Sequence, residues 1–277
     1  MPFAMNGPVR LYYETFGSPD DPTLILVNGL GNQSPSFRDE MCEAFVAVGV
    51  RVVRFDNRDV GLSSDGPDEY SLKGMASDVI AVAENLSVPA FHVMGFSLGG
   101  MIVQNLAIEW PERLLTATSV MSTTGDYDVG HPSERAKELL LTPGSPHREE
   151  AVRAHLAGQE VWGSPGLVEW DVQHDLAGRL FDRACRPEGV GRQYRAARRD
   201  GSRTERLAGV SVPFLVIHGS ADTLIHVSGG RRTAEAVPGA RFVEIDGMGH
   251  DYPSGLWPRL IAEFGSFALQ SRAGGPT

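Results

Sequence analysis

The chain has 277 residues, of which 42% are hydrophobic and 22% charged, a composition that is ordinary for a soluble globular protein. The formal net charge of −10 disfavours nucleic acids and anionic membranes as partners. No apolar run approaches the roughly 20 residues that a membrane span needs, and the N-terminus lacks the basic stretch and apolar core of a secretory signal. Cys42 and Cys185 lack the spacing of a redox or metal motif. We therefore expect a cytoplasmic protein with reduced thiols.

Short apolar segments alternate with amphipathic segments along much of the chain. The predicted strands are Val9–Glu14, Leu24–Val27, Val50–Phe55, Phe91–Met94, Ala117–Met121, Phe214–His218 and Arg241–Ile245. The predicted helices between and after them are Phe37–Val48, Leu72–Leu86, Leu98–Glu109, Gly229–Val237 and Leu256–Leu269. This alternation predicts an α/β fold with a mostly parallel central sheet and helices on both faces.

The alternation stops over residues 122–207, which lack strand-like runs. Helical patterns occur there near Ser133–Leu141, Arg148–Trp162, Leu167–Ala184 and Val190–Arg199, separated by Pro and Gly turn signals. We predict that residues 122–207 form a helical cap inserted into an α/β core made of residues 1–121 and 208–277. Four aromatic residues of the segment either line a pocket or form the cap's own small core: Trp162, Trp170, Phe181 and Tyr194.

Two other segments have unusual composition. The stretch Arg179–Arg206 is rich in arginine and forms either an anion-binding surface or, as charge runs more often do, a solvated helix face. The tail Gln270–Thr277 contains Ala-Gly-Gly-Pro and is expected to be disordered.

Residues 95–99 read Gly-Phe-Ser-Leu-Gly and stand between a predicted strand and a predicted helix. A serine at such a turn is lifted clear of the sheet edge, and the flanking glycines let the backbone pass closely without Cβ clashes. By itself the pattern also fits an ordinary Gly-rich turn, because the chain holds 32 glycines. Ser97 becomes a candidate nucleophile if the rest of the chain supplies a base and an orienting acid.

Two downstream loops offer that base and that acid. Asp222 follows the predicted strand Phe214–His218, at the end of the strand where function collects in open α/β sheets. His250 ends the Gly-rich loop after Arg241–Ile245, so the order Ser, Asp, His matches a known triad order. Asp126, which follows the predicted strand Ala117–Met121, is the alternative acid.

The chain resembles the α/β-hydrolase fold family over almost its whole length, with Gly95–Gly99, Asp222 and His250 as anchors. More narrowly, the sequence Arg-Phe-Asp-Asn-Arg-Asp-Val-Gly-Leu-Ser of residues 54–63 and Gly-Met-Gly-His of residues 247–250 resemble actinobacterial carboxylesterases of the aclacinomycin methylesterase-like type, which cleave a methyl ester on a polyketide. The resemblance implies that Ser97 is the nucleophile, His250 the general base and then acid, and Asp222 the orienting acid.

An oxyanion hole needs two backbone donors close to the nucleophile. The N–H of Leu98, at the start of the predicted helix after the elbow, is expected to be one of them. The resemblance implies the N–H of Leu30 as the second. Many relatives have His where this chain has Asn28, a departure that leaves backbone donors unaffected.

Three remaining sites are predicted to be structural. The segment Asp56–Ser63 is interpreted as an Asp-Arg pair that braces a loop under the active site. His92 and His218 lie in predicted strands and are expected to be buried and hydrogen-bonded rather than ligands. No His, Cys or Asp cluster has metal spacing, and no phosphate-binding loop is present, so neither a metal nor a cofactor is predicted.

These features predict a serine-dependent hydrolase that cleaves a carboxylic ester of a small to medium apolar substrate through an acyl-enzyme intermediate. The expected partner is a small-molecule ester. A homodimer is an alternative to a monomer as the oligomeric state. The sequence does not identify the substrate-binding residues. Three alternatives remain: a carbon–carbon bond hydrolase, a polyketide methylesterase, and a ligand-binding protein with vestigial turnover.

Overall fold

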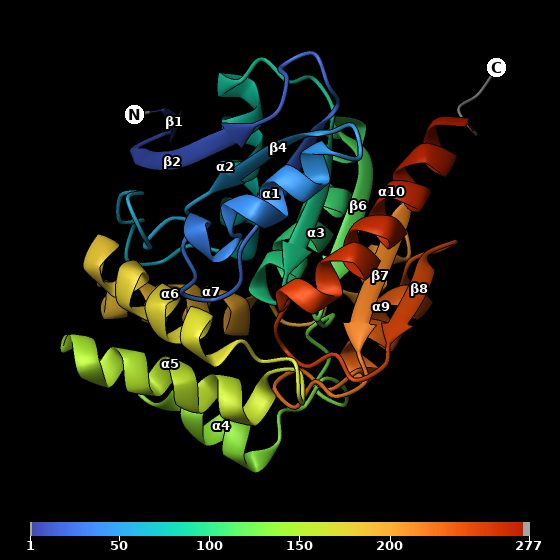
Figure 1. Ribbon diagram of the computed structural model, residues 1–277. Helices are drawn as coiled ribbons and strands as arrows, with labels where there is room; N and C mark the ends of the chain where they lie inside the picture. The colour runs from blue at the N-terminus through green and yellow to red at the C-terminus, as the bar shows by residue number, and fades with distance from the viewer. Residues whose placement is uncertain (1, 274–277) are drawn as a thin grey trace.

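A single mixed sheet runs through the computed structural model, which describes residues 2–273 (Figure 1). Within those residues the sheet has eight strands in the order β1-β2-β4-β3-β5-β6-β7-β8. Strands β1 and β4 both pair antiparallel with β2, and all the other neighbours are parallel. The bounds are β1 Phe3–Asn6, β2 Val9–Phe16, β3 Thr23–Val27, β4 Arg51–Phe55, β5 Phe91–Phe96, β6 Leu114–Val120, β7 Phe214–Gly219 and β8 Arg241–Ile245. The predicted α/β fold with a mostly parallel sheet is confirmed.

Helices cover both faces of the sheet because the central strands are apolar on both sides. In β3, Leu24 and Leu26 pack into one apolar cluster, whereas Ile25 and Val27 pack into the other, as the two-residue period of a strand requires. Helices α1 (Asp39–Val46) and α10 (Trp257–Ala273) complete the first cluster. Helices α2 (Leu72–Asn85), α3 (Leu98–Glu109), α8 (Thr204–Leu207) and α9 (Ser228–Ala236) lie on the opposite face. None of the helices described is both long and apolar enough to cross a membrane.

Four helices occupy the chain between β6 and β7. They are α4 (Glu134–Leu141), α5 (Arg148–Trp162), α6 (Trp170–Arg183) and α7 (Pro187–Asp200), and they gather at one end of the molecule (Figure 1). The side chain of Ser133 accepts a hydrogen bond from the Ala136 N–H and thereby caps α4. We call these four helices the cap.

Arginines of α6 and α7 join the cap to the core. Arg183 pairs with Asp56 at 2.8 Å and Arg192 pairs with Asp59 at 2.7 Å, and both aspartates are fully buried. Farther out, Arg199 of α7 pairs with Glu69 at 2.8 Å. The arginine-rich stretch is therefore not a free anion-binding surface, because several of its guanidinium groups are neutralised by core carboxylates. Arg179 and Arg199 stay at least half exposed, as expected of a solvated helix face.

The segment after β4 holds these carboxylates in place. Asp56 accepts hydrogen bonds from the Ser34 N–H at 2.6 Å and the Leu62 N–H at 2.8 Å. Arg58 instead makes a two-point ion pair with the buried Asp78 of α2. The predicted Asp-Arg bracing exists, but each partner lies outside the segment.

The structure corrects the sequence-based boundaries at both ends of the chain. Strand β1 was not predicted; it is only four residues long and joins β2 through a two-residue turn at Gly7, whose φ is +57°. Helix α10 continues to Ala273, so the expectation of disorder is wrong for residues 270–273. Within the predicted tail, the helix-breaking Gly and Pro begin at residue 274. The rest of that predicted segment, residues 274–277, lies outside the described residues.

Candidate active site

Ser97 occupies a sharp turn between β5 and α3. Its φ of +56° and ψ of −118° are strained for a residue with a side chain. A Cβ on Gly95 would lie 2.1 Å from the Gly99 carbonyl oxygen, and a Cβ on Gly99 would lie 2.1 Å from the Val27 carbonyl oxygen. The Ser97 N–H donates to the Val120 carbonyl at 2.9 Å, which ties the turn to the neighbouring strand. Only glycine at both flanking positions allows this elbow to form.

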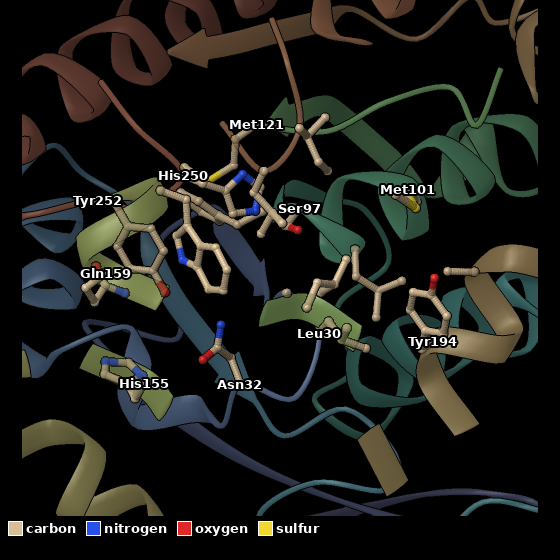
Figure 2. Close-up of a pocket in the computed structure, with 18 residues that line it drawn as sticks. Leu30, Asn32, Ser97, Met101, Met121, His155, Gln159, Tyr194, His250 and Tyr252 are labelled. Carbon is tan, nitrogen blue, oxygen red and sulfur yellow. The ribbon is translucent and has the colours of Figure 1, made fainter. Parts of the chain in front are cut away.

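Asp222 and His250 meet at the carboxyl ends of β7 and β8. The His250 Nδ1–H donates to Asp222 Oδ2 at 2.7 Å. The other carboxylate oxygen of Asp222 accepts from the Leu224 N–H at 2.9 Å and the Ile225 N–H at 2.8 Å. Because the acid is held on both oxygens, it fixes the orientation of the imidazole ring. His250 and Ser97 line the same cavity (Figure 2).

A second histidine contacts the same carboxylate. His218 Nε2 lies 3.3 Å from Asp222 Oδ2 and donates to the Ile225 carbonyl at 2.8 Å. Burial alone would raise the pKa of Asp222, but the attraction of His250 and the hydrogen bonds from both histidines outweigh it and hold that pKa below its usual range. The carboxylate therefore stays ionised at neutral pH.

The expectation that His218 and His92 are buried and hydrogen-bonded is confirmed. His218 is fully buried, and His92, also buried, has its Nδ1 2.8 Å from Thr116 Oγ1. Within residues 2–273 no three His, Cys, Asp or Glu side chains are grouped in a way that could hold a metal ion.

Asp126, the alternative acid, belongs to a different network. Its carboxylate pairs with Arg232 at 2.6 Å, accepts from the Thr204 hydroxyl at 2.7 Å and also accepts from the Ser202 hydroxyl. Burial alone would raise the pKa of Asp126, but these hydrogen bonds lower it to about 2. Since His250 pairs with Asp222 instead, the geometry favours Asp222 as the orienting acid.

The two predicted oxyanion donors lie beside Ser97. Leu98 is the first residue of α3, and Leu30 lies in the loop after β3; both residues line the cavity. That loop runs close to Ser97, since a Cβ on Gly29 would lie 3.2 Å from Ser97 Cβ. In the part of the chain that the structure describes, neither the Leu30 nor the Leu98 N–H donates to another protein group. Asn28 is buried behind the loop, and its Nδ2 donates to the Gln33 carbonyl at 2.9 Å.

The end of α5 positions the His250 loop, a contact that the sequence analysis missed. The His250 N–H donates to the Trp162 carbonyl at 2.5 Å, and the Gly249 N–H donates to the Ser164 hydroxyl at 2.9 Å. Ser164 is held in turn by Asp251, whose Oδ1 accepts from the Ser164 N–H at 2.9 Å. A Cβ on Gly249 would lie 2.4 Å from the Trp162 carbonyl oxygen. The glycine beside the histidine was the one sequence signal of this close approach.

The cavity over Ser97 has a volume of about 300 Å³ and is walled partly by the cap (Figure 2). The cap side chains that line it come from three helices: Leu140, His155, Gln159, Trp162, Tyr194 and Ala197. Two of the four aromatic residues considered from the sequence, Trp162 and Tyr194, therefore face the pocket. Trp170 neither lines this pocket nor lies in a core of the cap, because 48% of it is exposed to solvent.

Comparisons with known proteins agree with this architecture. A model of the alpha/beta hydrolase fold family matches residues 22–252. Rhodomycin D methylesterase DnrP of Streptomyces peucetius is 31% identical over 286 residues, covering 93% of this chain and 94% of the relative. The 3-oxoadipate enol-lactonase 2 of Acinetobacter baylyi is 28% identical and covers 83% of this chain and 82% of its own.

Solved structures share the fold over nearly the whole chain. A hydrolase from Pseudomonas aeruginosa superposes with a TM-score of 0.75 at 25% identity, covering 98% of this chain and 97% of the other. A meta-cleavage product hydrolase from Pseudomonas fluorescens reaches a TM-score of 0.80 at 18% identity, covering 98% of both chains. The resemblance to methylesterases noted from the sequence is confirmed by the curated relatives. The family match spans Ser97, Asp222 and His250, and the chain is a member of the α/β-hydrolase fold family.

Proposed function

We propose that this protein is a serine-dependent carboxylic ester hydrolase that works through an acyl-enzyme intermediate. The observation that carries the proposal is the convergence of a strained serine and an oriented histidine on one cavity. Ser97 stands on the elbow between β5 and α3, and His250 is held by Asp222 at 2.7 Å. Methylesterase and enol-lactonase relatives support ester cleavage as the reaction.

The first half of the reaction forms the acyl-enzyme. Ser97 Oγ attacks the ester carbonyl carbon while His250 Nε2 takes its proton, since Nδ1 already donates to Asp222. The negative charge on the carbonyl oxygen is met by the free N–H groups of Leu30 and Leu98. His250 then gives its proton to the departing alkoxide, and the alcohol leaves.

The second half releases the acid. Water loses a proton to His250 and attacks the acyl carbon, the oxyanion forms again at the same two N–H groups, and His250 protonates Ser97 Oγ as the bond to the acyl group breaks. Asp222 stays ionised throughout and stabilises the imidazolium that forms in each half. The sum is one ester and one water giving one acid and one alcohol.

The cavity favours an uncharged substrate of modest size. Its volume of about 300 Å³ lies at the small end of ligand pockets, and no Asp, Glu, Lys or Arg is among the described residues that line it. The methylesterase relatives make methyl esters the first substrates to test.

The testing experiment measures hydrolysis of p-nitrophenyl and methyl esters of increasing acyl length by the wild type and by Ser97→Ala. We expect turnover by the wild type and a loss of about 10⁴-fold or more in the variant, because the nucleophile is removed. The matched control is Ser18→Ala, which removes a hydroxyl from an exposed loop and should keep full activity. A fluorophosphonate probe should label the wild type at Ser97 alone.

Other results would point to the remaining alternatives. Binding of esters without hydrolysis of any of them would favour a ligand-binding protein. Turnover of a diketone that survives in Ser97→Ala would favour carbon–carbon bond hydrolysis. Either result would overturn the acyl-enzyme mechanism.

A further inference from the structure

The cavity over Ser97 has two chemically different ends (Figure 2). Met101 and Tyr194 lie at one end. Of these two side chains, only Tyr194 carries a hydroxyl group. The opposite end carries four polar side chains, which we call the polar end: Asn32, His155, Gln159 and Tyr252. Ser97 and His250 lie between the two ends. A substrate that extends to both sides of Ser97 would contact both ends.

The polar end is assembled from three separate parts of the chain. His155 and Gln159 project from the same face of α5, one helical turn apart. Asn32 follows the loop that carries Leu30, and Tyr252 follows His250 by two residues. All four also line a smaller adjoining cavity of about 80 Å³. Side chains from distant segments thus converge on one place next to the reacting atoms.

Part of the hydrogen-bonding capacity at the polar end is unused, although His155 Nε2 lies 2.9 Å from Gln173 Oε1. The side-chain oxygen of Gln159 is buried and accepts no hydrogen bond from any described residue. Asn32 uses its Oδ1 to accept from the Ser36 hydroxyl at 3.4 Å, which leaves its amide hydrogens available. A buried polar group without a partner is costly, so a ligand that satisfies it gains affinity.

The groups at the polar end are uncharged. Burial lowers the pKa of His155 and raises the pKa of Tyr252, so both are neutral at neutral pH. Three charged residues line the smaller cavity but not the one over Ser97: Arg38 and Glu169 pair with each other at 3.4 Å, and Asp251 accepts from the Ser164 N–H at 2.9 Å. A charged substituent would be buried here without a counter-ion, which is strongly unfavourable. A hydroxyl or carbonyl group can make hydrogen bonds at the polar end without burying a charge.

We propose that the polar end is a recognition subsite for an uncharged oxygen substituent, a hydroxyl or a carbonyl, on the substrate ester. This inference rests on the proposed ester hydrolase function and narrows its substrates to oxygenated, uncharged esters. Gln159 is the central recognition group, because its buried oxygen accepts from a substrate hydroxyl and its amide hydrogens donate to a substrate carbonyl.

The test compares esters that differ only by a hydroxyl or a methyl group of similar size. One pair carries the substituent on the acyl side, as methyl 4-hydroxyphenylacetate and methyl 4-methylphenylacetate. The other carries it on the alcohol side, as 2-(4-hydroxyphenyl)ethyl acetate and 2-(4-methylphenyl)ethyl acetate; both pairs are repeated with 3-substituted rings. We expect kcat/KM to favour the hydroxyl ester about tenfold in at least one pair, the size of one to two neutral hydrogen bonds.

The variant Gln159→Leu keeps the side-chain size and removes the hydrogen-bonding groups. The hydroxyl-to-methyl ratio of kcat/KM should fall to about one or below it. Glu160→Leu is the control, since it makes the same replacement at the next, exposed position of α5 and should keep the wild-type ratio.

Three results would count against the subsite. A wild type that hydrolyses the methyl-substituted esters as well as or better than the hydroxyl esters in every pair would overturn this inference and leave the ester hydrolase proposal intact. An unchanged hydroxyl-to-methyl ratio of kcat/KM in Gln159→Leu would show that Gln159 does not recognise the substituent. It too would leave the ester hydrolase proposal intact. Absence of any ester turnover would overturn both proposals together.

Discussion

The two sides of the cavity are held in place by different forces. On the sheet side, α3 buries nine of its twelve residues, and it carries Leu98 and follows Ser97. On the cap side, α5 buries only two of its fifteen residues, although it brings His155, Gln159 and Trp162 to the cavity. Close apolar packing therefore positions the candidate nucleophile, whereas the cap depends more on polar contacts with the core.

In the proposed function, this difference assigns bond cleavage to the sheet side of the cavity and substrate recognition to the cap side. Apolar packing on both faces of a sheet leaves little room for movement, and a reacting serine needs that precision. The cap is joined to the core by ion pairs such as Arg183 with Asp56, and by the hydrogen bond from the His250 N–H to the Trp162 carbonyl. Substitutions on the sheet side should change the rate of bond cleavage, and those on the cap side should change stability and substrate preference.

The largest effect is expected when Asp222, rather than the alternative acid Asp126, is replaced. Asp222→Asn should lower kcat about 10⁴-fold, because an amide no longer holds His250 in the tautomer that accepts the serine proton. Asp126→Asn should change kcat by less than about twofold, since that residue pairs with Arg232 outside the cavity. Steady-state kinetics on the best p-nitrophenyl ester measures both. Equal losses in the two variants would contradict the assignment of Asp222.

A smaller effect, on stability, is expected where the cap meets the core. Arg183→Met leaves the fully buried carboxylate of Asp56 without its cation and should cost about 3 kcal/mol in the free energy of unfolding. The control, Arg179→Met, removes a pair with Asp175 one turn earlier on α6, where the side chains are 59% and 68% exposed. That control should cost less than about 0.5 kcal/mol. Urea unfolding curves distinguish the two, and equal midpoints would show that the cap does not depend on the Asp56 pair.

The smallest effect is a change in how stability depends on pH. The pKa of Asp126 is lowered to about 2, so its contribution is fully present above the ordinary aspartate value of about 3.9 and is lost as the pH falls from there toward 2. Asp126→Asn should therefore be less stable than the wild type at pH 6, with a gap that narrows as the pH is lowered to 3. Thermal unfolding across this range measures the gap, and Asp20→Asn, on an exposed loop, is the control. A gap independent of pH would rule out the ionised carboxylate as its cause.

Several features could be predicted from the sequence because they depend on neighbouring residues. The elbow at Ser97 follows from glycines two positions away on each side, and the predicted helix Leu98–Glu109 coincides with α3. The strands ending near Asp222 and His250 were visible as short apolar runs, so both residues could be placed at one edge of the sheet. Local steric rules and side-chain periodicity carry this information, and they act over a few residues.

Other features depend on contacts between segments that are separate in the sequence, and only the tertiary structure shows them. The choice of Asp222 over Asp126 depends on which loop the His250 ring reaches, and nothing local distinguishes one aspartate after a strand from another. Gln159, whose side-chain oxygen has no partner among the described residues, lines the cavity because α5 lies across the carboxyl ends of the strands, although the helical pattern of α5 resembles that of any surface helix. Asp56 was predicted to take part in an Asp-Arg bracing pair, but its partner Arg183 is supplied by the distant cap. Local sequence therefore determined the elements and the elbow, and the tertiary path of the chain decided the partners, because contacts between separate segments of the chain leave no periodic trace in the sequence.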